Sequence, residues 1–298
     1  MGGIYALVPT PYNNKGEFNE KVFRENIKKV CKAGIHGIVT TGTLGEFNTI
    51  SWEEHQRLIV ALKDETSKYN TTSIAGCSGV NTREAIKKTK FAEENGIDAV
   101  MNVVPFYQIL NRDEVVEYYS NLACACPNIG IIVYNNPFTG RVLHNAETFK
   151  RLSKIPNIIG SKETTADFVH WMELVKIKEL SFMHIDHVFV PSMMWGGKGC
   201  FSFSACLKPD LILQAYHACI EKDWEKAMDL QYKINDLLFI NNLGDYIMRP
   251  AGDPSLFKPM IEAAGFLKTG NPGKPYLPIS DKLKKSLEKQ MKEKLLKT

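Results

Sequence analysis

The segment IIGSKETT, residues 158–165, contains a short apolar run that leads directly into Lys162. A continuous run of apolar and small residues is typical of a strand in a parallel sheet, where helices cover both faces. Lys162 is therefore expected where the predicted strand, residues 158–161, ends. Partial burial disfavours an ammonium relative to the free amine, and the free amine is a nucleophile toward carbonyl groups. Because most lysines are solvated surface residues instead, the role of Lys162 depends on its neighbours.

The pattern of a short apolar strand, a polar loop and an amphipathic helix recurs along the chain. The predicted strands are 4–9, 37–41, 73–75, 99–104, 130–134, 158–161, 181–185 and 199–203. The predicted helices are 20–32, one beginning at Ser51, one beginning at Asn81, 112–125, 146–153, 167–177, 189–194 and 210–221. Alternating strands and helices imply a parallel sheet with right-handed crossovers. Roughly eight such units favour an α/β fold of the (β/α)8 TIM barrel type. The first strand is not followed by Gly-x-Gly-x-x-Gly, which disfavours an open dinucleotide-binding sheet.

After residue 222 the pattern changes to helices alone. Helices are predicted at 224–240, 254–264 and 282–297, with a turn-rich linker at 270–275. We therefore divide the chain into a catalytic barrel, residues 1–222, and a C-terminal helical region, residues 223–298. Two roles are open for this helical appendage, packing on the barrel or a contact between subunits.

The composition is that of an ordinary globular protein. Of the 298 residues, 44% are hydrophobic and 23% are charged, a balance that supports a large core. The formal net charge of +4 is small, and the body of the chain holds no dense Lys/Arg block, so no nucleic-acid partner is predicted. The lysines of residues 282–297 alternate with leucines at helical spacing. That spacing favours a solvated basic helix face over a membrane or polyanion site.

The seven cysteines are scattered through apolar context without a Cys-x-x-Cys pair. They are predicted to be reduced packing residues of a cytoplasmic protein. Cys124 and Cys126 are too close together for ordinary zinc-site spacing, so no metal is expected. The N-terminal residues show neither the basic segment nor the apolar stretch of a signal peptide. No run approaches the roughly 18 apolar residues of a membrane span, so no membrane association is expected.

Three further strand ends carry candidate functional groups, and in a barrel of this kind such ends meet at one face. Residues 42–46 form a glycine-rich loop whose backbone amides can cradle a carboxylate, with Thr43 adding a hydroxyl; an ordinary tight turn is the alternative. The fifth strand ends at Tyr134, and Tyr107 follows the fourth. A phenol there can exchange protons with a reacting carbonyl or simply anchor its hydroxyl to the backbone. Together with Lys162, these groups match the needs of imine chemistry on a 2-keto acid.

Three short motifs occur in the order and at about the spacing of one known family: GTxGE at 42–46, YNxP at 134–137 and GxK at 160–162. On these motifs the chain resembles the dihydrodipicolinate synthase and N-acetylneuraminate lyase family, the class I pyruvate-dependent aldolases. The resemblance extends over nearly the whole chain, including its helical C-terminal part.

This resemblance implies a role for each candidate catalytic residue. Lys162 would form an imine with pyruvate or a pyruvate-yielding substrate, and the adjacent carbon–carbon bond would break or form through an enamine. Tyr134 would shuttle protons. Thr43 would relay them together with Tyr107, which in that family comes from a neighbouring subunit.

The same resemblance implies the partners of the protein. Gly42, Thr43 and Leu44 would hold the carboxylate of the 2-keto acid through their backbone amides, and an aldehyde would be the second reactant or the product. A homo-oligomer, dimer or tetramer, is expected, with no metal or organic cofactor. Glu163, next to the lysine, is expected to be structural.

Two departures from the lysine-pathway synthases bear on the second substrate. Leu44 occupies the place of a second threonine, and Phe138 and Thr139 occupy the stretch where those enzymes carry an arginine for the second substrate's carboxylate. Arg141, slightly farther along, is an alternative partner for that carboxylate. An apolar residue at position 44 is similar to the hydratase-aldolase branch, which cleaves arylidene-pyruvates to pyruvate and an aromatic aldehyde. An apolar wall suits an aryl group.

Segments 51–54 (SWEE), 81–84 (NTRE) and 263–268 (AAGFLK) also resemble that branch. We therefore expect a Schiff-base-forming lyase that releases pyruvate and an aldehyde, as a hydratase-aldolase or related 2-keto acid aldolase. A 2-keto-3-deoxygluconate-type aldolase and dihydrodipicolinate synthase are the enzyme alternatives. A keto-acid-binding regulatory protein and a structural assembly subunit are the non-enzyme alternatives. Trp195 either lines the substrate pocket or serves in packing.

Overall fold

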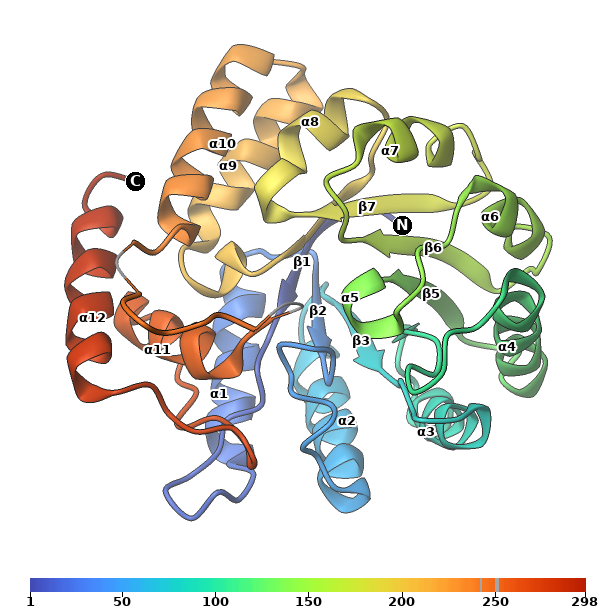
Figure 1. Ribbon diagram of the computed structural model, residues 1–298, viewed down its shortest axis with the longest axis horizontal. Helices are drawn as coiled ribbons and strands as arrows, with labels where there is room; N and C mark the ends of the chain where they lie inside the picture. Colours follow the sequence, from blue (N-terminus) through green and yellow to red (C-terminus); the bar gives the residue numbers. More distant parts are fainter. Residues whose placement is uncertain (242, 250–251) are drawn as a thin grey trace.

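The computed structural model describes residues 1–241, 243–249 and 252–298. Its eight strands form a closed barrel in which neighbours in the chain pair in parallel and β8 pairs with β1 (Figure 1). The strands are β1 (Gly3–Leu7), β2 (Gly37–Thr40), β3 (Thr72–Gly76), β4 (Ala99–Asn102), β5 (Gly130–Asn135), β6 (Ile158–Glu163), β7 (Ser181–Ile185) and β8 (Gly199–Ser202). Most strand residues are buried, because side chains fill the barrel and helices cover it outside. The predicted (β/α)8 barrel is confirmed.

Helices surround the barrel in chain order (Figure 1). They are α1 (Glu20–Lys32), α2 (Trp52–Thr66), α3 (Thr82–Glu94), α4 (Arg112–Ala125), α5 (Pro137–Gly140), α6 (Ala146–Leu152), α7 (Phe168–Leu174), α8 (Phe189–Met194), α9 (Pro209–Glu221), α10 (Trp224–Leu238), α11 (Pro254–Ala264) and α12 (Asp281–Leu295), with 3-10 turns η1 (Asp186–Val188) and η2 (Ser204–Cys206). The predicted capping box begins α2: the Ser51 side chain accepts from the Glu54 amide, and the Glu54 carboxylate accepts from the Ser51 amide.

Strand β6 is longer than the sequence pattern predicts. The apolar run predicts a strand that stops at residue 161, but β6 continues through Glu163. Lys162 is paired with Tyr134 of β5, and Glu163 is paired with Asn135. Pairing with a neighbouring strand therefore determines where β6 ends, and polar residues remain in the sheet. Lys162 is a buried residue within the strand, not a residue beyond its end.

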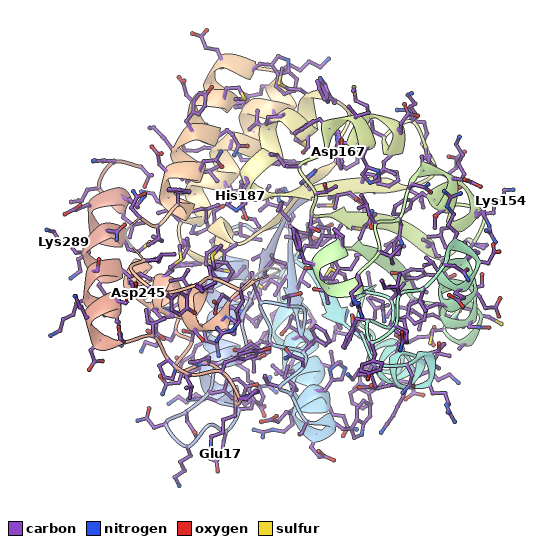
Figure 2. The ribbon with its side chains drawn as sticks, in the orientation of Figure 1. Glu17, Lys154, Asp167, His187, Asp245 and Lys289 are labelled. Atoms are coloured by element: carbon purple, nitrogen blue, oxygen red, sulfur yellow. The ribbon has the colours of Figure 1, made fainter. Side chains whose placement is uncertain are left out.

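Two apolar clusters stabilise the fold. Inside the barrel, a small cluster includes Tyr5, Ile74, Met101, Ile132 and Phe201. A much larger cluster lies between strands and helices and contains buried residues from β1 through α12. The helices α10, α11 and α12 therefore share an apolar core with the barrel. Charged side chains such as Lys154 and Lys289 extend from the periphery into solvent (Figure 2).

The C-terminal helices pack on the barrel, with α11 between α12 and the barrel (Figure 1). The side chain of Asn26, on α1, donates to the carbonyl of Lys268 at 2.6 Å and accepts from the Lys268 amide at 3.1 Å. The amide of Tyr12 donates to the carbonyl of Thr269 at 3.1 Å. Of the two roles left open for this appendage, packing on the barrel is thus observed. Within the described residues, no helix has both the length and the apolar character needed to cross a bilayer.

Candidate active site

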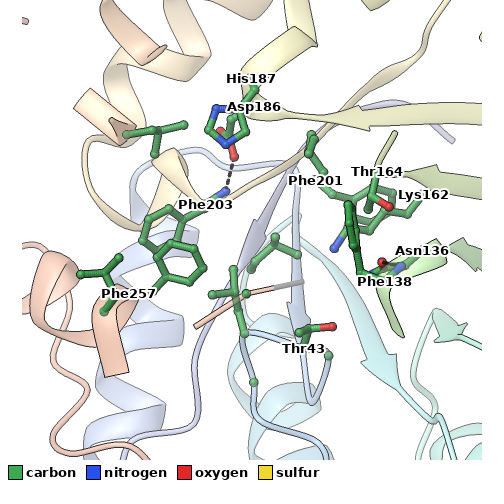
Figure 3. A pocket seen from close by; sticks show the side chains of 18 of the residues that line it. Thr43, Asn136, Phe138, Lys162, Thr164, Asp186, His187, Phe201, Phe203 and Phe257 are labelled. Atoms are coloured by element: carbon green, nitrogen blue, oxygen red, sulfur yellow. Dashed lines mark hydrogen bonds between the residues drawn. The ribbon is translucent and has the colours of Figure 1, made fainter. Parts of the chain in front are cut away.

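Lys162 and Tyr134 lie side by side inside the barrel. They occupy the same register position on β6 and β5, and the Lys162 Nζ atom lies 4.2 Å from the centroid of the Tyr134 ring. The Phe201 ring is 5.7 Å from the same nitrogen. Lys162 is only 4% exposed, yet it lines the central cavity (Figure 3). The fold therefore places a buried amine among aromatic rings at the wall of a cavity.

The Tyr134 hydroxyl is held by two neighbours. It lies 3.2 Å from Thr43 Oγ1, and Asn136 Nδ2 donates to it at 3.0 Å. Burial alone would raise the pKa of Tyr134, but the Lys162 ammonium and the hydrogen bonds with Thr43 and Asn136 outweigh burial and lower that pKa below its ordinary value. With a lowered pKa, the Tyr134 hydroxyl can give up and take back a proton more readily than an ordinary tyrosine.

The loop that carries Thr43 follows β2 and is tightly wound. Thr41 and Glu46 have φ angles of 52° and 56°, the left-handed region that non-glycine residues rarely occupy. A Cβ atom on Gly45 would lie 2.5 Å from the Thr41 nitrogen, so only glycine fits there. The amide of Glu46 donates to the Thr43 carbonyl at 3.0 Å. The backbone N–H groups of Thr43 and Leu44 find no acceptor among the described residues, which leaves them available to an anion.

A cavity of about 490 Å³ opens above Lys162 and is bounded by residues from both the barrel and the C-terminal region (Figure 3). Its wall is mainly apolar. Apolar lining residues include Leu44, Phe138, Phe203, Phe239, Leu243 and Phe257. Polar lining residues are Thr43, Tyr134, Asn136, Lys162, Thr164, Asp186 and His187. Gly42 also lies on the wall, so the structure brings together most of the residues singled out from the sequence.

Tyr107, Arg141 and Trp195 lie outside the cavity. Tyr107 is 80% exposed, and its carbonyl accepts a hydrogen bond from Arg141 Nη1 at 2.8 Å. Neither side chain lines the cavity of this chain. Trp195 packs edge-on against Phe168, with ring centroids 5.0 Å apart, so the packing alternative for this tryptophan is observed.

Four polar residues of the cavity wall were given no role from the sequence pattern, and Asn136, Asp186 and His187 are three of them. Asn136 caps the short helix α5, and its Asn-Pro dipeptide is the signal that could have indicated a cap. Asp186 accepts from the Ser202 hydroxyl and the Phe203 amide, each at 2.6 Å. His187 follows it in the 3-10 turn η1. Nothing local in the sequence distinguishes these last two from ordinary loop residues.

Glu163 points to the other side of β6, away from the cavity. Its carboxylate accepts from Ser161 Oγ at 2.5 Å and from Asn135 Nδ2 at 2.8 Å. Burial raises the pKa of Glu163, although His170, Ser161 and Asn135 oppose the shift. The residue ties β6 to β5 directly behind Lys162, in agreement with the structural role expected for it. In the described ranges, no group of three or more His, Cys, Asp or Glu side chains is arranged to hold a metal ion.

A (β/α)8 barrel with a buried lysine beside a tyrosine, facing a cavity at its centre, has the architecture of a class I aldolase. The model of the Dihydrodipicolinate synthetase family matches residues 1–294. The chain belongs to this family, whose enzymes are pyruvate-dependent class I aldolases and lyases that form a covalent lysine–pyruvate imine without an external cofactor.

Individual relatives agree with this assignment. The 4-hydroxy-tetrahydrodipicolinate synthase of Desulfotalea psychrophila is 31% identical over 295 residues, covering 97% of this chain and 95% of that protein. The crystal structure of dihydrodipicolinate synthase from Aquifex aeolicus superimposes with a TM-score of 0.89 at 27% identity, covering 99% of both chains. CdNal from Clostridium difficile, solved in complex with mannosamine, gives a TM-score of 0.88 at 25% identity, covering 98% of this chain and 99% of that one. These relatives support the synthase alternative better than the hydratase-aldolase prediction.

Proposed function

We propose that Lys162 of this protein forms an imine with the keto carbon of pyruvate. The observation that carries the proposal is the buried Lys162 amine beside Tyr134 at the central cavity. The amine adds to the keto carbon, the carbinolamine loses water, and the protonated imine withdraws electrons from the neighbouring methyl group. Loss of a proton from that methyl group gives an enamine, which attacks an aldehyde carbon. The reverse sequence breaks the same carbon–carbon bond.

Tyr134 moves protons at the reacting oxygen atoms in this mechanism. Its hydroxyl protonates the carbinolamine oxygen, which leaves as water, and later protonates the alkoxide that forms from the aldehyde. Thr43 Oγ1, 3.2 Å away, passes protons to and from the phenol. Asn136 donates to the phenol oxygen and so stabilises its deprotonated form.

The loop of residues 42–44 binds the carboxylate of pyruvate. The amides of Thr43 and Leu44 have no acceptor within the described residues, and both residues line the cavity near Lys162. Backbone N–H groups that converge in a tight turn are suited to anions. A carboxylate held there leaves the keto carbon free to meet the lysine.

Tyr107 completes the proton relay of a second subunit in this proposal. Its side chain is 80% exposed, and Ile109, two residues farther along the chain, is 60% exposed. Apolar and aromatic side chains exposed together are typical of a protein interface. The proposal therefore includes a homo-oligomer in which each subunit supplies a tyrosine to its neighbour.

Two candidates remain for the aldehyde. The names of the relatives favour aspartate semialdehyde, which would make this protein a 4-hydroxy-tetrahydrodipicolinate synthase. The cavity wall supports a second candidate, an aldehyde or arylidene-pyruvate with an apolar group. Leu44, Phe138 and Phe257 supply an apolar surface, while the Arg141 guanidinium is engaged with the Tyr107 carbonyl outside the cavity.

Borohydride trapping tests the imine. The protein is incubated with pyruvate and reduced with borohydride, and the peptides are analysed by mass spectrometry. The expected result is a reduced pyruvyl adduct on the peptide that contains Lys162, and no adduct on Lys162→Met. A folded wild-type protein that gives no adduct would contradict the proposal.

A substrate panel then separates the candidates for the aldehyde. Aspartate semialdehyde plus pyruvate, arylidene-pyruvates, 2-keto-3-deoxygluconate and N-acetylneuraminate are compared by kcat/KM. The synthase candidate predicts the highest value for aspartate semialdehyde plus pyruvate. Preference for an arylidene-pyruvate would select the apolar candidate instead.

A further inference from the structure

Glu46 and Lys258 form an ion pair in the interior of the protein, between the barrel and the C-terminal region. Glu46 ends the loop of residues 42–46, and Lys258 lies on α11. The Lys258 and Glu46 side chains are 1% and 0% exposed. Lysine and glutamate are rarely buried so completely unless their position is tightly specified.

The remaining bonds of the pair reach two further segments. Lys258 Nζ donates to the Asn271 carbonyl at 2.9 Å and lies 4.5 Å from the centroid of the Tyr12 ring. The second carboxylate oxygen of Glu46 accepts from the Gly273 amide at 2.6 Å. The pair thus connects four segments: the loop after β2, the loop after β1, helix α11 and the turn of residues 270–275 before α12.

The ion pair is anchored at the end of the 42–46 loop, the loop that carries Thr43. Glu46 has a φ of 56°, a backbone conformation that persists only where surrounding contacts impose it. Its amide donates to the Thr43 carbonyl at 3.0 Å, and the Glu46 carbonyl accepts from the Thr49 amide at 2.8 Å. The Gly45 carbonyl accepts from Thr10 Oγ1 at 2.7 Å. A shift of Glu46 would therefore move Thr43, whose hydroxyl meets Tyr134.

We propose that Lys258 is a positioning residue for the reaction: through its buried ion pair with Glu46 it holds the 42–46 loop so that Thr43 meets the Tyr134 hydroxyl. The C-terminal region, residues 223–298, then belongs to the catalytic apparatus as well as to the core. The proposal rests on the proposed function of Tyr134 and Thr43. A buried ion pair adds little net stability compared with apolar residues of similar volume, which favours a geometric role.

Lys258→Met tests the proposal, because it keeps most of the side-chain volume and removes the charge. Displacement of Thr43 takes a hydrogen bond from the Tyr134 hydroxyl, so the pKa of Tyr134 rises. That pKa is measured by ultraviolet difference titration against Tyr134→Phe in each background, which needs neither substrate nor turnover. We expect an upward shift in Lys258→Met, together with a fall in kcat of about tenfold to a hundredfold.

Two further variants make the result specific. Asn26→Ala removes the paired hydrogen bonds to Lys268 and so loosens the same C-terminal region without touching the 42–46 loop. It is expected to lower stability and leave the Tyr134 titration unchanged. The double variant Glu46→Gln with Lys258→Met leaves no unpaired buried charge. It serves if Lys258→Met alone does not fold, and it is expected to show the same upward shift.

The possible results distinguish the positioning role of Lys258 from the proposed catalytic function. An unshifted Tyr134 titration with kcat within twofold of wild type, in Lys258→Met or in the double variant, would overturn the positioning role. An equal upward shift in Asn26→Ala would also overturn it, because a general loosening would then suffice. Failure of wild-type protein to form the pyruvate adduct would contradict the proposed function instead, and the substrate-free titration would still decide whether Lys258 positions Thr43.

Discussion

Tyr134 and Lys162 occupy the same register position on adjacent strands, and the lysine nitrogen lies 4.2 Å from the tyrosine ring centroid. Side chains opposite each other on parallel strands project to the same side of the sheet. The ammonium lowers the pKa of the buried phenol, so the register places the proposed acid–base group beside the proposed nucleophile. Replacing either residue should therefore affect the chemistry more than the fold.

Tyr134→Phe is expected to lower kcat by about 10²- to 10⁴-fold, the usual contribution of a general acid–base. The reduced adduct on Lys162 should still form, but more slowly, because the amine is retained. Adding borohydride at successive times after mixing with pyruvate gives the rate at which the adduct forms. Tyr118→Phe is the control, since this buried hydroxyl donates to the Val103 carbonyl and the residue does not line the cavity. Equal kcat values for Tyr134→Phe and wild type would contradict the role of the phenol.

Thr43→Val is expected to shift the alkaline limb of the kcat/KM profile to higher pH. In the proposed mechanism the protonated Tyr134 is the acid, so activity falls as pH rises through its pKa, which in the wild type lies below the ordinary value for tyrosine. Hydrogen bonding with Thr43 helps to lower that pKa; without the hydroxyl the pKa rises, and the fall in activity follows it upward. Thr43→Ser keeps a hydroxyl and should retain the wild-type limb. A limb that moves to lower pH in Thr43→Val would contradict this assignment.

The barrel could be predicted from the sequence because each strand–helix unit has its own local pattern. Lys162, Tyr134 and Thr43 could be predicted as neighbours because strand ends of a parallel barrel meet at one face. The full length of β6 could not be predicted from the sequence, because pairing of Glu163 with Asn135 keeps polar residues in the strand.

The roles of Lys258 and Asn136 could not be predicted either, because they depend on contacts that local sequence patterns do not show. Lys258 has the appearance of a polar position on an amphipathic helix, and only the fold shows that its partner is Glu46. Asn136 has a helix-capping pattern, whereas its contact with the Tyr134 hydroxyl depends on the geometry of α5. The tertiary setting thus gives these residues a role that local patterns do not carry.

Gly45→Ala is expected to slow imine formation by about tenfold or more, because a new Cβ atom would lie 2.5 Å from the Thr41 nitrogen and displace the loop. Overpacking of this kind typically destabilises a protein by about 1–3 kcal/mol, which urea unfolding would measure. Gly34→Ala is the control: its φ is +79°, and a Cβ there meets nothing within 4 Å. It should lower stability through backbone strain while imine formation proceeds at the wild-type rate.

Glu163→Gln is expected to change how stability depends on pH. Burial raises the pKa of Glu163 in the folded protein, so the folded state retains its proton at pH values where the unfolded carboxyl has lost it. The stabilisation is fully present below the unfolded pKa of about 4.3 and is lost as pH rises through the higher folded value. Glutamine does not titrate, so the variant should lack this loss. Urea unfolding at several pH values above 4 would measure it, and identical pH profiles would contradict the prediction.

Leu44→Thr is expected to change aldehyde preference. Leu44 lines the cavity, and losing an apolar contact of this size typically weakens binding of an apolar group by about 1–3 kcal/mol, or 10- to 200-fold in kcat/KM. The ratio of kcat/KM for an aromatic aldehyde to that for aspartate semialdehyde should fall accordingly, whereas the volume-conserving Leu44→Met should leave it nearly unchanged. Arg141→Ala should leave the KM for aspartate semialdehyde unchanged, because the Arg141 guanidinium donates to the Tyr107 carbonyl and does not line the cavity. A large rise in that KM would instead identify Arg141 as the partner of the second carboxylate.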